Sequence, residues 1–112
     1  MSAGSPHPPE VSVSEAAAAV AGGAPLIDVR EVSEFEEVRV PEAVSIPLGD
    51  VLGRANELDR DRRLYVICAV GGRSLAATEA LRKAGFDAVS VSGGTNGWAL
   101  EGREVVRGPA SS

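Results

Sequence analysis

Short, nearly continuous apolar segments recur along this chain, separated by segments in which apolar residues return at helical spacing. Short apolar runs bounded by turn-forming residues are typical of buried strands in a parallel sheet. The segments with this character are predicted as strands and cover residues 10–13, 26–29, 43–46, 64–68 and 88–91.

The segments between these strands have helical character. An alanine-rich stretch predicts a helix over 15–20, with Ser14 as its N-cap and Gly22-Gly23 as its end. Further helices are predicted over 33–37 with Ser33 as cap, over 48–58, over 74–84, and in a short segment that Thr95 or Asn96 caps and that contains Trp98. Strands that alternate with helices predict an α/β fold, in which helices flank a parallel sheet.

The chain length of 112 residues suits one domain with one core, which we predict over residues 10–107. Residues 1–9 are rich in Pro, Gly and Ser, and we expect them to form a disordered tail; residues 108–112 are expected to be frayed. The only histidine, His7, lies in this tail. The folded domain therefore offers no imidazole for Cys–His catalysis of the protease type.

The composition argues against several classes of protein and kinds of site. The net charge of −5 argues against a general nucleic-acid-binding surface, and no run approaches the roughly 20 apolar residues of a membrane span. The single cysteine excludes an internal disulfide and a cysteine-rich metal cage. A free thiol is best tolerated in a reducing compartment, so we expect a cytoplasmic protein. No metal or organic cofactor is expected.

That cysteine, Cys68, ends the predicted strand 64–68, and a turn of residues 69–73, which contains Gly71, Gly72 and Arg73, separates it from a predicted helix that begins at Ser74. Backbone N–H groups of such a turn, together with a helix N-terminus, favour an anion. We therefore expect a depressed pKa for the Cys68 thiol and a usable nucleophile. A lone cysteine at a strand end is more often a small buried hydrophobic residue, but that role requires neither the glycines nor the arginine.

The motif Cys68-x-x-Gly71-x-Arg73-Ser74 resembles the active-site loop of the rhodanese-like sulfurtransferases. Other segments agree with this family in order and spacing: an Asp-x-Arg strand end at 26–31, the following strand at 41–47, and a Gly-Gly-x-x-x-Trp signature at 91–98. Several motifs in the right order are far more specific than any one alone.

The resemblance covers residues 11–107 and implies the rhodanese-like three-layer fold, a parallel sheet of roughly five strands flanked by helices. One segment departs from the family. Residues 38–43 lack the two glycines and the histidine that usually precede the third strand. Arg39 lies in this segment, where it would either add positive charge at the mouth of the site or be solvated.

The resemblance also implies an activity. Cys68 would take the outer sulfur of a donor such as thiosulfate, hold it as a persulfide and pass it to an acceptor. The residues expected to bind the substrate are Ala69, Val70, Gly71, Gly72, Arg73 and Ser74. The expected partners are a small anionic sulfur donor and a thiol or cyanide acceptor, and a protein could serve as acceptor.

Two alternatives stay open. A rhodanese-like module without catalysis could bind a partner or sense oxidants through Cys68. A small cysteine-dependent phosphatase or arsenate reductase is disfavoured, because such enzymes of related design place five residues between cysteine and arginine. Four residues separate Cys68 from Arg73, and a smaller loop suits one sulfur atom better than a tetrahedral phosphate.

The sequence leaves more than one role open for the charged residues near the predicted site. Arg73 could hold the anionic donor or bind a carboxylate and brace the loop. Asp28 and Arg30 are expected to support the site, because the carboxyl ends of parallel strands lie at one edge of a sheet. Asp28 would accept backbone hydrogen bonds or cap its strand, and Arg30 would pair with Glu34 or Glu37. Trp98 is expected in the core.

Overall fold

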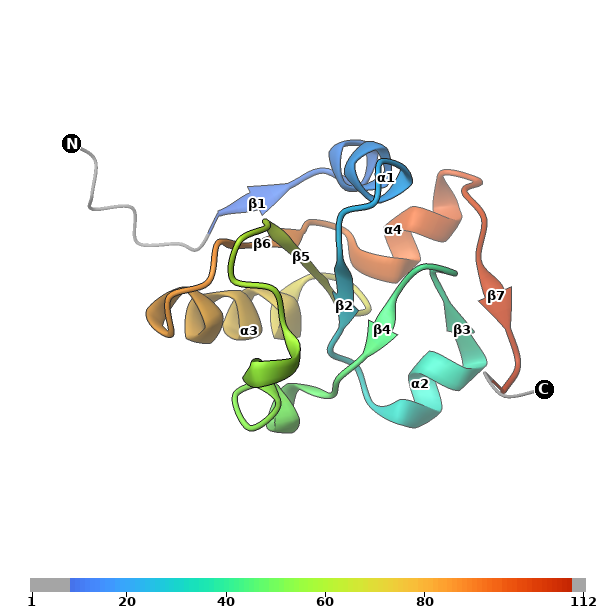
Figure 1. Ribbon diagram of the computed structural model, residues 1–112. Helices are drawn as coiled ribbons and strands as arrows, with labels where there is room; N and C mark the ends of the chain where they lie inside the picture. The colour runs from blue at the N-terminus through green and yellow to red at the C-terminus, as the bar shows by residue number, and fades with distance from the viewer. Residues whose placement is uncertain (1–8, 110–112) are drawn as a thin grey trace.

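The computed structural model describes residues 9–109, and a parallel sheet forms its centre (Figure 1). Its strands are β1 (Glu10–Val11), β2 (Leu26–Asp28), β4 (Val44–Ser45), β5 (Leu64–Ile67) and β6 (Ala88–Val91), in the order β1-β6-β5-β2-β4. Each neighbouring pair is parallel, which confirms the predicted α/β fold with a five-stranded sheet. The predicted tail up to residue 8, with His7, and residues 110–112 lie outside the described part of the chain.

Helices cover both faces of this sheet (Figure 1). On one face α1 (Val13–Ala21) and α4 (Gly94–Leu100) bury Val13, Ala16, Val20 and Trp98 against Leu26, Ile67 and Val91. On the other face α3 (Gly72–Lys83) buries Ala77 and Leu81 against Ile27, Leu64 and Val66. Successive strand residues thus point to opposite cores, which explains why these strands are apolar throughout. Trp98 is a core residue, as predicted.

A second, two-stranded sheet was not predicted. The short helix α2 (Val32–Glu37) leads directly into β3 (Val38–Arg39), which pairs antiparallel with β7 (Val106–Arg107). Arg39 is not solvated, which was one of its two expected roles, because its side chain is buried and donates to the Phe35 carbonyl at 3.2 Å. Its guanidinium lies 5.3 Å from the Phe35 ring centre. Arg39 also binds the carbonyl of Gly108 and so attaches the end of β7 to α2.

The helix starts differ from the predicted caps. Ser12 rather than Ser14 caps α1, because the Ser12 hydroxyl accepts from the Glu15 N–H while the Glu15 carboxylate accepts from the Ser12 N–H. This reciprocal arrangement satisfies two backbone N–H groups at the start of the helix, those of Ser12 and Glu15, which the helix itself leaves without a partner. Likewise α2 begins after Glu31 instead of Ser33, and α4 begins after Gly93 instead of Thr95 or Asn96.

The predicted helix over 48–58 is also wrong. The segment forms two separate 3₁₀ turns, Leu48–Asp50 and Ala55–Glu57. Its apolar residues still pack on the α3 side of the core, at Leu48, Val51, Ala55 and Leu58. Glycines at positions 49 and 53 weaken a continuous helix here, so the spacing of apolar residues identified the buried face but not the local conformation.

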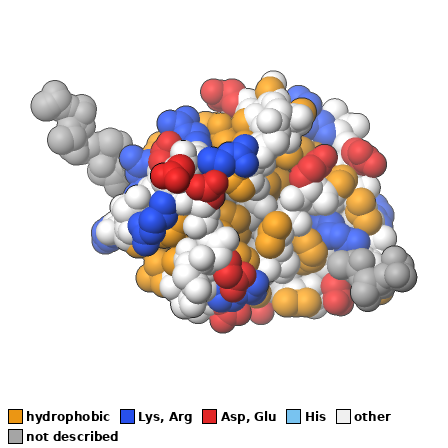
Figure 2. All heavy atoms as spheres, in the orientation of Figure 1, with side chains coloured by type: hydrophobic (Ala, Val, Ile, Leu, Met, Phe, Trp, Pro, Cys, Tyr) orange, Lys and Arg blue, Asp and Glu red, His pale blue; other side chains and the backbone are white. Residues whose placement is uncertain are grey.

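The surface carries charges of both signs. Figure 2 shows acidic and basic side chains interspersed on one face, with apolar side chains between them. Among residues 9–109, the helices are too short or too polar for any of them to cross a lipid bilayer.

Candidate active site

Cys68 follows β5, a central strand, at the carboxyl end of the sheet. The residues Cys68 to Gly71 connect β5 to α3, so the cysteine lies at the position where this architecture places ligands. Its side chain is only 1% exposed, while Val70 at the tip of the same loop is 66% exposed. The thiol therefore lies beneath an exposed loop.

The surroundings of the Cys68 sulfur are polar in spite of this burial. The Gly71 N–H donates to Sγ at 3.1 Å, and Ser74 Oγ lies 3.4 Å from Sγ. Burial raises the pKa of the Cys68 thiol, but hydrogen bonds from the Ser74 hydroxyl and from the N–H groups of Ser74, Gly71 and Val70 outweigh it, and the net pKa is lowered. The arrangement thus favours the thiolate, the nucleophilic form of cysteine.

Glycine at position 71 makes this geometry accessible. Gly71 is the N-cap of α3 and has φ 125° and ψ −13°, a region that residues with a Cβ rarely adopt. The turn directs the Gly71 N–H back towards Sγ while α3 begins at the next residue. Gly71, one of the two glycines that singled out this loop in the sequence, is therefore needed for its path, whereas Gly72 lies in the first turn of α3 with open space around an added Cβ.

The N-terminus of α4 holds the cysteine loop from behind. The N–H groups of Thr95 and Asn96 donate to the carbonyls of Cys68 and Ala69, at 2.8 and 3.0 Å. A Cβ added at Gly94 would lie 2.5 Å from both carbonyl oxygens, so only glycine permits this contact. The sequence showed Gly93-Gly94 only as part of the Gly-Gly-x-x-x-Trp signature and this role was missed, although the paired glycines were the available signal.

Arg73 braces the loop. Its guanidinium binds the Glu34 carboxylate of α2 with two hydrogen bonds, of 2.6 and 2.9 Å. This bidentate hydrogen bond to Arg73 lowers the pKa of Glu34 to about 2. Of the two predicted roles for Arg73, the structure therefore contains the carboxylate-bound one.

Asp28 and Arg30 form a buried ion pair at the end of β2. Asp28 accepts from the Arg30 backbone N–H at 3.0 Å, as expected, and its carboxylate binds the Arg30 guanidinium at 2.7 Å. The predicted pairing of Arg30 with Glu34 or Glu37 is wrong, because the guanidinium instead bridges Asp28 and the Val38 carbonyl, at 2.6 Å. This bridge fixes the end of α2, the helix that carries the partner of Arg73.

A sequence model described as the rhodanese-like domain matches residues 12–101. The chain belongs to the rhodanese-like domain family. Rhodanese-related structures share its fold: a rhodanese-related protein from Thermoplasma volcanium superposes with a TM-score of 0.81 at 32% identity, covering 88% of this chain and 97% of that one.

Two curated relatives of this rhodanese-like chain carry names connected with sulfur. It is 43% identical over 74 residues to the putative sulfur carrier protein YrkF of Bacillus subtilis strain 168, covering 65% of this chain and 40% of YrkF. It is 41% identical over 73 residues to the putative sulfurtransferase YtwF of the same strain, covering 65% of this chain and 71% of YtwF. The chain thus spans well under two thirds of the length of YrkF and slightly more than two thirds of the length of YtwF. These relatives support a sulfur-transfer role of the rhodanese type.

One residue beside the rhodanese-like loop was missed altogether. Ser90 of β6 is fully buried, and its Oγ lies 2.8 Å from Ser74 Oγ. A serine between Val89 and Val91 in an otherwise apolar strand was the only signal, and its significance depends on which helix packs above it.

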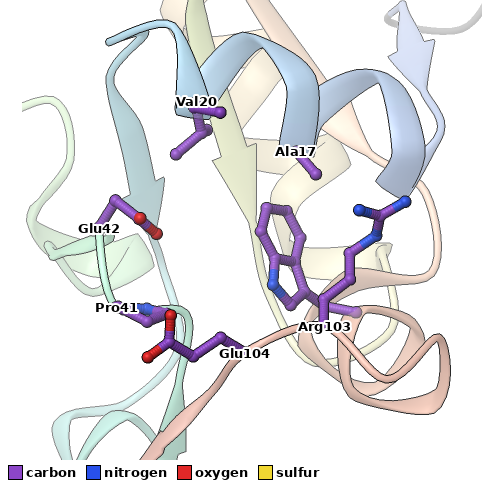
Figure 3. Close-up of a pocket in the computed structure, with 8 residues that line it drawn as sticks. Ala17, Val20, Pro41, Glu42, Arg103 and Glu104 are labelled. Atoms are coloured by element: carbon purple, nitrogen blue, oxygen red, sulfur yellow. The ribbon is translucent and has the colours of Figure 1, made fainter.

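A separate groove of about 140 Å³ lies between α1, the turn at residues 41–42 and the segment 103–104 (Figure 3). Glu42, Arg103 and Glu104 line it together with Ala17 and Val20 of α1. Its described lining includes none of the residues predicted for the site, so the groove is distinct from the cysteine loop.

Proposed function

We propose that this protein is a sulfurtransferase that carries a sulfane sulfur on Cys68 as a persulfide. The observation that supports this most strongly is the polar environment of a buried sulfur, with the Gly71 N–H at 3.1 Å and the Ser74 hydroxyl at 3.4 Å. Donors fixed around a sulfur stabilise negative charge there without reorganising during the reaction.

In the first step, the Cys68 thiolate attacks the outer sulfur of a donor such as thiosulfate. A new S–S bond forms between Cys68 and the outer sulfur. The bond between the two donor sulfurs breaks, and the inner sulfur keeps the electron pair and leaves as sulfite. The negative charge then lies on the outer persulfide sulfur, which the loop N–H groups from Ala69 to Arg73 and the start of α3 are suited to stabilise.

In the second step, an acceptor thiolate or cyanide attacks the outer sulfur. The persulfide S–S bond breaks, its electron pair returns to Cys68, and the products are a persulfide of the acceptor or thiocyanate. Neither step needs a metal or an organic cofactor. The acceptor is a small thiol, cyanide or a thiol carried by another protein, and a thiol that must stay reduced suits the cytoplasm.

Arg73 has an indirect role in this mechanism. Its bidentate ion pair with Glu34 spans 39 positions of the sequence and ties the loop to α2. Because these guanidinium nitrogens already bind a carboxylate, we assign recognition of the anionic donor mainly to backbone N–H groups of residues 69–74. Arg73 then keeps the loop in the conformation that directs those groups.

Mass spectrometry of the intact protein tests the proposal directly. After exposure to thiosulfate, wild type is expected to gain one sulfur atom with release of sulfite, and cyanide should remove that atom as thiocyanate. Cys68→Ser and Cys68→Ala should show neither reaction, because the chain contains no other cysteine.

Two results would contradict the proposal. Hydrolysis of p-nitrophenyl phosphate that depends on Cys68, without any sulfur uptake, would favour a phosphatase. Reversible oxidation of Cys68 by peroxide, with no sulfur uptake from thiosulfate or from other persulfide donors, would favour a redox-sensing module.

A further inference from the structure

A chain of buried hydroxyl groups continues from Cys68 into the core. Ser74 Oγ lies 3.4 Å from Cys68 Sγ, 3.1 Å from the Gly71 carbonyl oxygen and 2.8 Å from Ser90 Oγ. Cys68 is 1% exposed, and Ser74 and Ser90 are fully buried. Bulk water therefore does not compete for these hydrogen bonds, and the few protons present must be shared among fixed atoms.

The direction of the bond between Ser74 and Ser90 follows from the available acceptors. Within residues 9–109, Ser74 Oγ is the hydrogen-bond partner of Ser90 Oγ. A buried hydroxyl without an acceptor is unfavourable, so the Ser90 proton points to Ser74 Oγ. Ser74 then accepts from Ser90, and its own proton is free to reach the Gly71 carbonyl or the sulfur.

We propose that Ser90 is a positioning residue, which holds the Ser74 hydroxyl as a hydrogen-bond donor to the Cys68 thiolate. In the thiol form, Cys68 donates to Ser74 Oγ, and Ser74 donates to the Gly71 carbonyl. When the thiol ionises, the Ser74 proton turns from Gly71 to the sulfur, while Ser90 continues to donate to Ser74. Donation by Ser90 also polarises the Ser74 O–H and makes it a stronger donor. As a role in sulfur transfer, this inference rests on the proposed function.

Charged groups near Cys68 come from other elements than β6. Arg73 of α3 acts electrostatically on Cys68, and it is itself paired with Glu34 of α2, with Glu31 nearby. Asp28 and Arg30, at the end of the neighbouring strand β2, neutralise each other. Strand β6 and helix α4 contribute no titratable side chain. A change confined to the Ser90 hydroxyl therefore leaves every nearby charge in place.

The test compares the pH dependence of Cys68 alkylation by iodoacetamide in the full chain. Ser90→Ala is expected to slow alkylation about three- to tenfold at pH values well below the thiol pKa, and to leave the plateau rate at high pH unchanged. Thr78→Val is the matched control. Thr78 is a fully buried residue of α3, one turn after Ser74, and its hydroxyl has no hydrogen-bond partner in the described part of the chain.

The outcomes separate a positioning role from simple packing. An unchanged alkylation profile in Ser90→Ala, or an equal shift in Thr78→Val, overturns the inference. Ser90→Thr keeps the hydroxyl and should retain the wild-type profile; a profile like that of Ser90→Ala also overturns it. Ser74→Ala should abolish the effect of Ser90→Ala in the double variant. Alkylation reports ionisation without sulfur transfer, so a wild type that takes up no sulfur refutes the proposed function alone.

Discussion

Replacing Glu34 by Gln removes the negative charge that holds Arg73, with little change in side-chain shape. The wild-type pair has two hydrogen bonds, of 2.6 and 2.9 Å, and joins α2 to the first turn of α3 directly beside the cysteine loop. Glutamine can still accept one hydrogen bond from Arg73. The variant therefore isolates the contribution of the charge.

The size of the effect follows from the pKa of Glu34, which Arg73 lowers from 4.5 to about 2. Taken in full, this difference corresponds to about 3 kcal/mol of folding free energy. The side chains of Arg73 and Glu34 are 38% and 34% exposed, so solvent screening reduces the expected contribution to about 1 kcal/mol. A carboxyl pKa that is lower in the folded state stabilises the fold above the unfolded pKa, and this stabilisation is lost as the pH falls towards the folded one.

Urea unfolding at a series of pH values measures this contribution. At pH 7 Glu34→Gln should be about 1 kcal/mol less stable than wild type, and the difference should shrink as the pH falls from 4.5 towards about 2. Glu79→Gln is the control, because Glu79 and its partner Lys83 are 59% and 77% exposed and 3.5 Å apart. That variant should change the unfolding free energy by only a few tenths of a kcal/mol.

The reasoning fails if both variants lose the same stability at neutral pH. It also fails if the loss in Glu34→Gln persists unchanged at acid pH, because the lost interaction would then not be that of an ionised carboxylate. A loss that 1 M salt does not reduce would likewise speak against a partly exposed ion pair.

Further predictions concern the residues that hold the loop and the sheet edge. Gly94→Ala should lower the unfolding free energy by about 3 kcal/mol and slow sulfur uptake, because its Cβ would lie 2.5 Å from the Cys68 carbonyl oxygen. Gly102→Ala, at φ +77° with open space around the added Cβ, should cost only about 1 kcal/mol; equal losses would contradict the clash. Asp28→Asn should cost about 3 to 5 kcal/mol in urea unfolding at pH 7, because Arg30 would remain buried without its counter-charge. A loss below 1 kcal/mol would show that Arg30 finds another partner.

Much of the fold was predictable because it depends on local pattern. Short apolar runs identified all five strands of the central sheet, and glycines identified the turn after Cys68. Strands β3 and β7 were not predicted, because each is a valine followed by an arginine that lies in no apolar run of strand length. The segment 48–58 was predicted wrongly as one helix, because its apolar spacing is helical although its backbone forms two short turns.

For the site, the sequence by itself indicated the candidate nucleophile, the Gly71 turn and, to within two residues, the start of α3, because these are neighbours in the chain. The tertiary structure alone decided the partners: Glu34 for Arg73, Asp28 for Arg30, and Ser90 for Ser74. The physical reason is that a charged or hydroxyl side chain pairs with whatever group the packed elements bring within about 3 Å, and that proximity is fixed by the sheet order and not by spacing along the chain.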